Sequence, residues 1–232
     1  MIGVFVNVLT VLIGSTVGLL FKKGLPDKIT KAIMVGLGLC VIYIGVSGVL
    51  EGTNPIIAVI CMAIGGGVGA LIDIDKRINR LGEWLASKFK KNSGQGSVAE
   101  SFVSGCLMFC VGAMTIVGSL NSGLGIEGGL EMIYTKSVLD LISSAVLAAS
   151  LGFGVIFSAA FVLVFQGGIV LLAELLQPLL TAAVISEITC VGSLMIIALG
   201  LNMVGATKIK VANYMPALVI VPVAVWAMSL IG

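Results

Sequence analysis

The sequence predicts an all-α polytopic membrane protein with about eight transmembrane helices. Of the 232 residues, 59% are hydrophobic and only 10% are charged, and the mean hydropathy is +1.21. Soluble domains carry about a quarter of charged residues. The apolar segments approach the roughly 20 residues that a helix needs to cross the hydrocarbon core, whereas barrel strands are about ten residues long and alternate strictly. We therefore expect one integral membrane domain over residues 1–232.

The expected helices follow one another along the chain. They cover about residues 4–20, 32–50, 56–72, 102–120, 135–150, 155–175, 188–204 and 212–230. The first has neither a preceding basic stretch nor a following cleavage site, so we expect it to span the membrane rather than to be a cleaved signal. Residues 177–186, with Pro178, are hydrophobic as well. They form either a plain connector or a re-entrant half-helix.

A polar connector at about residues 73–98 interrupts the apolar pattern. It holds six basic residues, and apolar side chains recur in it at three- and four-residue steps around Trp84. This pattern is typical of an amphipathic helix on the membrane surface. A small soluble connector with a charged face is the alternative. Residues 92–97 have the composition of a flexible linker.

Basic residues predict the orientation. Twelve of the thirteen lie in the first, third and seventh connections, which all fall on one side of the membrane if the chain crosses it eight times. The positive-inside rule makes that side cytoplasmic. We therefore expect a bacterial inner (plasma) membrane protein with a cytoplasmic connector at 73–98 and both termini extracytoplasmic. A net charge of +2 is too small to indicate nucleic acid as a partner.

Glycine patterns suggest close helix packing and an internal repeat. Residues 13–20 and 64–71 both carry glycine at four-residue spacing, which permits packing within the chain or in a homo-oligomer. A weaker echo relates the second helix to the seventh, through Val-Gly at 35–36 and at 191–192. Because these two helices cross in opposite directions, the echo predicts an inverted repeat of helices one to three and six to eight.

The chain contains no histidine, which removes the usual general base and the commonest zinc ligand. All five cysteines lie in apolar segments, and the pair Cys106 and Cys110 lacks the further ligands that a soft-metal site needs. We therefore expect no enzyme, no metal and no cofactor. A Ser/Lys dyad would need no histidine, but the neighbours Lys136 and Ser137 point about 100° apart on a helix.

The strongest candidate site is a polar stripe in the fifth helix. Lys136 and Asp140 share a face at four-residue spacing, and Ser143 and Ser144 continue it. A buried ionisable group costs a few kcal/mol in a bilayer, so its presence suggests function. The structural alternative is a salt bridge near the outer interface, because a helix that begins at Thr135 would place Asp140 only about 7 Å deep.

Other polar residues extend this candidate site. Glu187 opens the seventh helix on the same side as Asp140, where it could instead cap its own helix. Asn202 and Asn213 are further candidates for solute or ion binding. Several more polar residues could hold helices together, line a path or form an acidic outer mouth that concentrates cations: Asn7, Gln166, Glu127, Glu131 and Glu174.

Four segments resemble a known family. These are the run Val111 to Leu120, the element Lys136-Ser137-Val138-Leu139-Asp140, the triplet at 186–188 and the run Asn213 to Leu218. They look like the bacterial membrane proteins grouped as domain of unknown function 554, and the likeness covers essentially the whole chain. The resemblance implies an inner-membrane protein, at most a candidate transporter, with no established substrate and no catalytic residues.

Two function hypotheses follow. The first is a small secondary transporter or channel-like carrier of an unidentified solute or ion, with its polar site in the fifth and seventh helices. The second is a non-transporting membrane scaffold or partner-binding subunit, whose segment from Asp73 to Lys91 docks a protein or anionic lipid. In both, the lipid bilayer is the immediate partner.

Overall fold

A computed structural model describes residues 1–22, 27–77, 80, 98–110 and 113–230. Within these residues the secondary structure is helical, which confirms the predicted fold class. The helices are α1 (Ile2–Lys22), α2 (Asp27–Val49), α3 (Pro55–Ile72), α5 (Val98–Cys110), α6 (Ala113–Gly123), α7 (Gly129–Leu151), α8 (Gly154–Leu171), α9 (Ala173–Leu176), α10 (Ala182–Met203), the 3-10 turn η1 (Val211–Tyr214) and α11 (Met215–Ser229).

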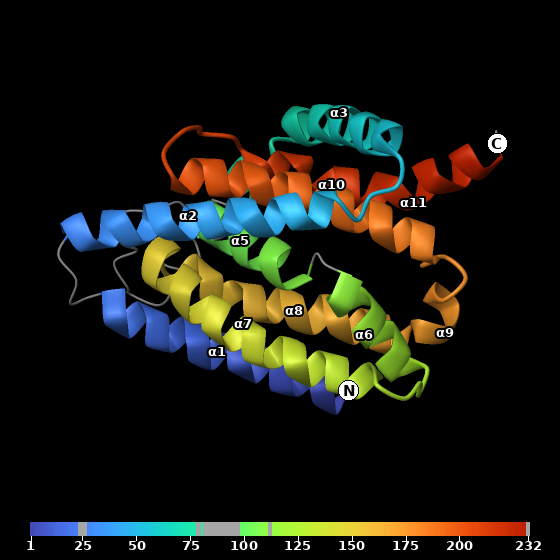
Figure 1. The fold of residues 1–232 in the computed structure, drawn as a ribbon, viewed down its shortest axis with the longest axis horizontal. Coiled ribbons are helices and arrows are strands. Elements are labelled where there is room, and N and C mark those ends of the chain that lie inside the picture. Colours follow the sequence, from blue (N-terminus) through green and yellow to red (C-terminus); the bar gives the residue numbers. More distant parts are fainter. Residues whose placement is uncertain (23–26, 78–79, 81–97, 111–112, 231–232) are drawn as a thin grey trace.

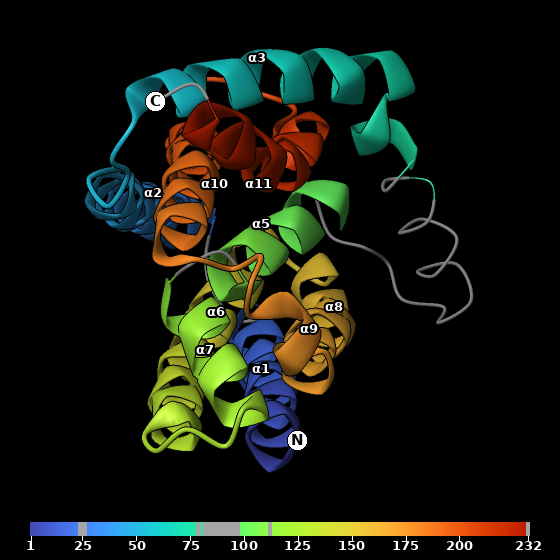
Figure 2. The ribbon, with the colours of Figure 1, turned by 90° about the vertical axis from the view of Figure 1, so that its right-hand side faces the viewer.

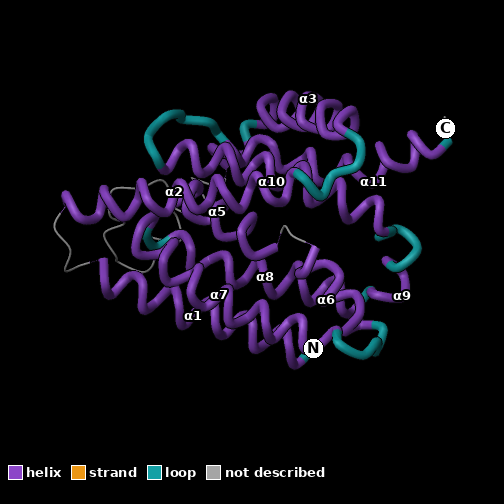
Figure 3. The backbone as a smooth tube through the Cα atoms, in the orientation of Figure 1, coloured by secondary structure: helices purple, strands orange, loops and turns teal. Residues whose placement is uncertain are grey.

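The helices form two groups that run along the long axis of the molecule (Figure 1). One group holds α1, α6, α7 and α8, and the other holds α2, α3, α10 and α11 (Figure 2). Helix α5 lies between the groups, where it packs on α8 and also reaches α10 and η1. The connections gather at the two ends of the bundle (Figure 3). Both chain ends lie at the same end, together with the α6–α7 loop and α9.

Glycines let three helix pairs pack backbone to backbone. In the parallel pair α1–α7, Gly14 meets Ser144 and the Leu141 carbonyl, and a Cβ at Gly18 would collide with the Ala145 carbonyl. In the antiparallel pair α2–α10, Gly38 faces Gly200. Helices α3 and α11 are also antiparallel, with Gly65 against Ala217. The predicted glycine faces are therefore used within the chain.

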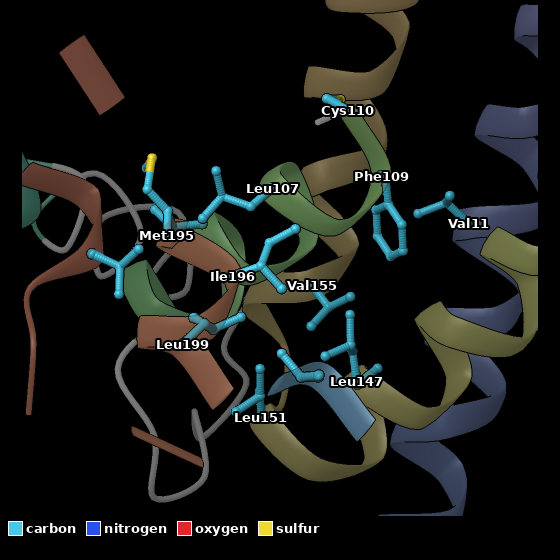
Figure 4. Packing of buried hydrophobic residues seen from close by; sticks show 14 of the residues in the cluster. Val11, Leu107, Phe109, Cys110, Leu147, Leu151, Val155, Met195, Ile196 and Leu199 are labelled. Carbon is cyan, nitrogen blue, oxygen red and sulfur yellow. The ribbon is translucent and has the colours of Figure 1, made fainter. Parts of the chain in front are cut away.

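The main apolar core lies where α5 meets the surrounding helices. Phe109 of α5 is fully buried among side chains that include Val11 of α1 and Leu147 of α7. On the other side, Leu107 packs toward Met195 of α10 (Figure 4). Truncating a buried phenylalanine to alanine costs about 3–5 kcal/mol, so this cluster holds the two groups together.

Local sequence explains how the helices begin and end. Asn54 caps α3, since its side chain accepts from the backbone N of Ile56 at 3.1 Å, and Pro55 follows at the first helical position. The helix ends at Asp73, whose φ of 51° is left-handed. The side chain of Thr181 caps α10 by accepting from the N of Val184. Residues 177–181 are a turn and a cap, and residues 182–186 form the first turns of α10.

By length and composition, six of the described helices can cross a membrane, or seven if α5 and α6 count as one bent span. The span predicted at 102–120 corresponds to two helices, α5 and α6, which are bent by 60° relative to each other. In α2 the described apolar stretch is the shorter Gly38–Val49. The count of eight and the inverted repeat therefore stay predictions. Most of the connector at 73–98 lies outside the described residues.

Two helices begin earlier than the sequence predicts. Helix α7 begins at Gly129 rather than Thr135, because the left-handed Gly128 precedes it and Glu131 lies in its first turn. Helix α10 begins at Ala182 rather than Ile188, because Thr181 provides the cap. Both shifts change the position of candidate site residues.

Candidate functional site

An ion pair lies at the centre of α7. The Nζ of Lys136 donates to both Oδ1 and Oδ2 of Asp140 at 2.7 Å, and the two residues are only 6% and 4% exposed. Helix α7 has 23 residues, so eleven lie on each side of Asp140, about 16 Å of helix in each direction. The helix start at Thr135, on which the expected depth of about 7 Å depends, is therefore wrong. In a bilayer centred on this helix, Asp140 lies near the midplane.

Two amides from neighbouring helices join this pair. Asn7 of α1 lies beside the Asp140 carboxylate and donates from Nδ2 to Gln166 Oε1 of α8 at 2.8 Å. Both amides are fully buried, and Gln166 Nε2 has no partner in the described part of the chain. We call Lys136, Asp140, Asn7 and Gln166 the central polar cluster. Sequence reasoning noted the two amides but did not place them with the ion pair.

The serines of the predicted stripe have other roles. Ser144 is buried against Gly14 and donates back to the carbonyl of Leu141 at 3.1 Å. It therefore serves the close contact between α1 and α7. Ser143 is half-buried on the same helix.

The cluster adjoins the bend between α5 and α6. Cys110, the last residue of α5, lies near Lys136 and Asp140. Thr115 of α6 donates back across the bend to the carbonyl of Phe109 at 3.1 Å. Cys110 also lines an apolar cavity of about 290 Å³, with Phe161 and Phe165 of α8. Cys110 therefore lines this cavity, whereas neither Lys136 nor Asp140 is among the residues that line it.

Glu187 occupies a different site from the one predicted. It lies in the second turn of α10, 1% exposed, and its Oε1 accepts from Thr53 N, Thr53 Oγ1 and Asn54 N at 2.8 Å each. It therefore fixes the turn between α2 and α3 instead of capping its own helix. Among the described residues, no hydrogen bond or ion pair joins Glu187 to Lys136 or Asp140.

Asn202 and Asn213 hold loops at the opposite end of the bundle. Asn202 donates to the carbonyl of Ile209 at 2.7 Å and accepts from Ile209 N and Thr207 Oγ1. Asn213 Oδ1 accepts from Asp75 N at 3.0 Å. A half-open cavity of about 400 Å³ lies beside these loops, and its lining includes Asn202, both acids Asp75 and Glu100, and both bases Lys208 and Lys210.

Charges are divided between the two ends of the bundle. Exposed acids, Glu51, Glu127, Glu131 and Glu174, lie in or beside the α2–α3 turn, the α6–α7 loop and α9, at the end that holds both chain ends. The described loops at that end carry no lysine or arginine. In the described part of the chain, no group of three or more cysteine and acidic side chains is placed to hold a metal ion.

These features define a polytopic helical membrane protein with a buried ion pair at its centre. The chain belongs to the family described as protein of unknown function (DUF554), whose model matches residues 2–226. It is 31% identical over 236 aligned residues to the uncharacterized membrane protein YdfK of Bacillus subtilis (strain 168), covering 100% of this chain and 99% of that protein. It is also similar to the uncharacterized protein YqgA of Escherichia coli (strain K12), at 28% identity over 94% of each chain. No solved structure matches the chain.

Proposed function

We propose that this protein is a small secondary transporter or channel-like carrier of a small solute or ion, and that the central polar cluster lies on its pathway. The observation that carries the proposal is the Lys136–Asp140 ion pair, buried at the centre of a helix long enough to cross a membrane. Charged residues at that depth are costly and typically mark solute, ion or proton pathways.

The bend beside the cluster supports the same function. Secondary transporters commonly build their sites where a helix is broken near the middle of the membrane. Here the end of α5 at Cys110 lies close to both charges, and α6 leaves at 60°. An apolar cavity, which Cys110 also lines, lies at the same bend.

Helix directions support the proposed inverted repeat. Such a repeat would relate α1 to α8, α2 to α10 and α3 to α11 in opposite directions. Each of these pairs is in contact, and the close approaches of Gly38 to Gly200 and of Gly65 to Ala217 are antiparallel. In the remaining pair, α1 and α8, Asn7 donates a hydrogen bond to Gln166. The central polar cluster would then lie at the junction of the two repeats.

The orientation belongs to the same proposal. Lys208 and Lys210 lie at the end opposite the exposed acids, and the positive-inside rule assigns that end to the cytoplasm. Both termini would then be extracytoplasmic in the plasma membrane. The alternative scaffold function depends on residues 73–91, most of which lie outside the described part, so it stays a prediction.

Reconstituted proteoliposomes test the proposed function. We would measure uptake of a panel of labelled amino acids, carboxylates, sugars and inorganic ions, with empty liposomes as background. The expected result is uptake of at least one solute, lost at least tenfold in Asp140→Asn but retained in the matched surface variant Asp73→Asn. Full uptake by Asp140→Asn would contradict the role of the cluster, and absence of uptake across the panel would favour the scaffold.

A further inference from the structure

We propose that Asp140, Asn7 and Gln166 form a binding site for an alkali-metal cation, and that Lys136 is a tethered cation occupying this site. The inference rests on the proposed function and deepens it by naming the ion and its ligands. In this arrangement Lys136 and the free cation exclude each other. Cation binding would therefore release the lysine from the carboxylate.

The ligands are oxygen atoms from three helices. Asp140 of α7 supplies both carboxylate oxygens, which the lysine now occupies, and the side-chain carbonyls of Asn7 and Gln166 lie in the same cluster. Carboxylate and amide oxygens suit hard cations. A bare ion can contact the amide oxygens and both carboxylate oxygens at the same time. A lysine ammonium group, which is held by its own side chain, contacts fewer of these oxygens at once.

Charge balance selects a monovalent ion. The cluster holds one positive and one negative charge, and it is almost fully buried. Exchanging the ammonium for an ion of the same charge keeps the site neutral. A divalent ion would leave a net positive charge away from water, which is strongly unfavourable.

Lys136 can leave without disturbing the helix packing. It and Asp140 belong to the same helix, so breaking their contact separates no two elements. Helical side chains lean toward the N-terminus of their helix, and Lys136 lies N-terminal to Asp140. A released Lys136 would therefore extend toward the start of α7, where Glu131 is exposed.

The amide group of Gln166 is not fully paired while lysine occupies the site. Its Nε2 is buried, has no acceptor among the described residues, and lies on a fully buried side chain. Leaving a buried donor unpaired costs about 1–3 kcal/mol. Turning the amide oxygens of Asn7 and Gln166 toward a bound ion would replace the hydrogen bond between them by two oxygen–cation contacts.

Surface charge favours a cation over an anion. The end of the bundle where α1 and α7 begin carries the exposed acids Glu127, Glu131 and Glu174, and its described loops hold no lysine or arginine. A mouth of one charge sign raises the local concentration of the opposite ion. Cations would thus be enriched at the end toward which the released Lys136 extends.

Thermal unfolding of the purified protein in phosphatidylcholine nanodiscs tests the site. Midpoints would be measured against NaCl, LiCl and KCl, with choline chloride keeping ionic strength constant. At least one alkali cation should raise the midpoint of the wild type, and Lys136→Met, which removes the competitor, should lower the half-saturating concentration at least tenfold. Asp140→Asn should abolish the shift. The exposed variant Lys76→Met should behave as the wild type.

Several outcomes would overturn the inference. The first is a cation-dependent shift of the unfolding midpoint that persists in Asp140→Asn. The second is a Lys136→Met protein whose midpoint does not change with any of the three salts, and the third is a midpoint that changes with pH but with none of these cations. If Lys136→Met does not fold, Gln166→Met, which leaves the ion pair intact, should weaken the cation effect at least threefold, and an unchanged effect would count against the site. Saturable binding without any transport would support this site while contradicting the proposed function. Solute uptake that does not depend on these cations would support the proposed function while contradicting the cation site.

Discussion

Glu187 of α10 binds both the backbone N and the Oγ1 of Thr53, which lies in the turn between α2 and α3. One carboxylate oxygen thereby joins the first part of the chain to the last. The same oxygen accepts from Asn54, whose side chain caps α3. Glu187, which the sequence suggests as a candidate for solute binding, thus holds the residues that begin α3.

We expect Glu187→Ala to destabilise the protein strongly. Three hydrogen bonds to a charged acceptor would be lost, and hydrogen bonds to charged groups contribute about 1.5–3 kcal/mol each, discounted here because Thr53 is exposed. The expected loss is about 2–4 kcal/mol, measured by reversible unfolding in nanodiscs. Glu174→Ala, at an exposed position in α9, is the control and should change stability by less than about 0.5 kcal/mol. Equal effects would contradict the anchoring role.

The ion pair of α7 should behave as a unit in a double-mutant cycle. Asp140→Leu leaves a buried ammonium unpaired and should cost about 3–5 kcal/mol, whereas adding Lys136→Met should recover most of that loss. Unfolding free energies of the four proteins give the coupling energy. Additive losses would mean that the two side chains do not depend on each other.

We expect glycine-to-alanine substitutions to destabilise the protein where the glycine contacts a neighbouring helix and to have little effect where it does not. Gly14→Ala places a Cβ against Ser144 and the Leu141 carbonyl and should cost about 1–3 kcal/mol. At Gly67 of α3 nothing lies within 4 Å, so Gly67→Ala should be neutral or stabilise by up to about 1 kcal/mol through helix propensity. Comparable destabilisation at both sites would contradict the packing of α1 on α7.

Orientation can be measured with reporters at the C-terminus. An alkaline phosphatase fused there should be active, and a green fluorescent protein should stay dark, because both termini are expected outside the cytoplasm. The reverse pattern would contradict the eight-crossing topology. A single cysteine introduced at Lys208 should, on the same expectation, be protected from an impermeant thiol reagent in intact cells.

Hydrophobicity and basic residues were sufficient to predict the fold class, because a bilayer imposes length and polarity on every crossing segment. Helix boundaries were harder, since α10 begins inside a hydrophobic connector and α7 begins beside a glycine-rich loop, and only Gly128 and Thr181 mark their starts. The pairing of Lys136 with Asp140 followed from spacing on one helix. Its partners Asn7 and Gln166 did not, because their contact depends on how α1 packs against α8.

The parallel contact of α1 with α7 also constrains how the protein is made. Gly14 and Gly18 of the first helix find their partners only when Leu141 to Ala145 have been synthesised. At about 5–20 residues per second, translation delays that meeting by roughly ten seconds, during which α1 must wait in the lipid or beside the insertion machinery. The glycine face of α1 therefore stays without its partner until α7 is made. We expect Lys136 and Asp140 to enter the membrane as α7 packs against α1.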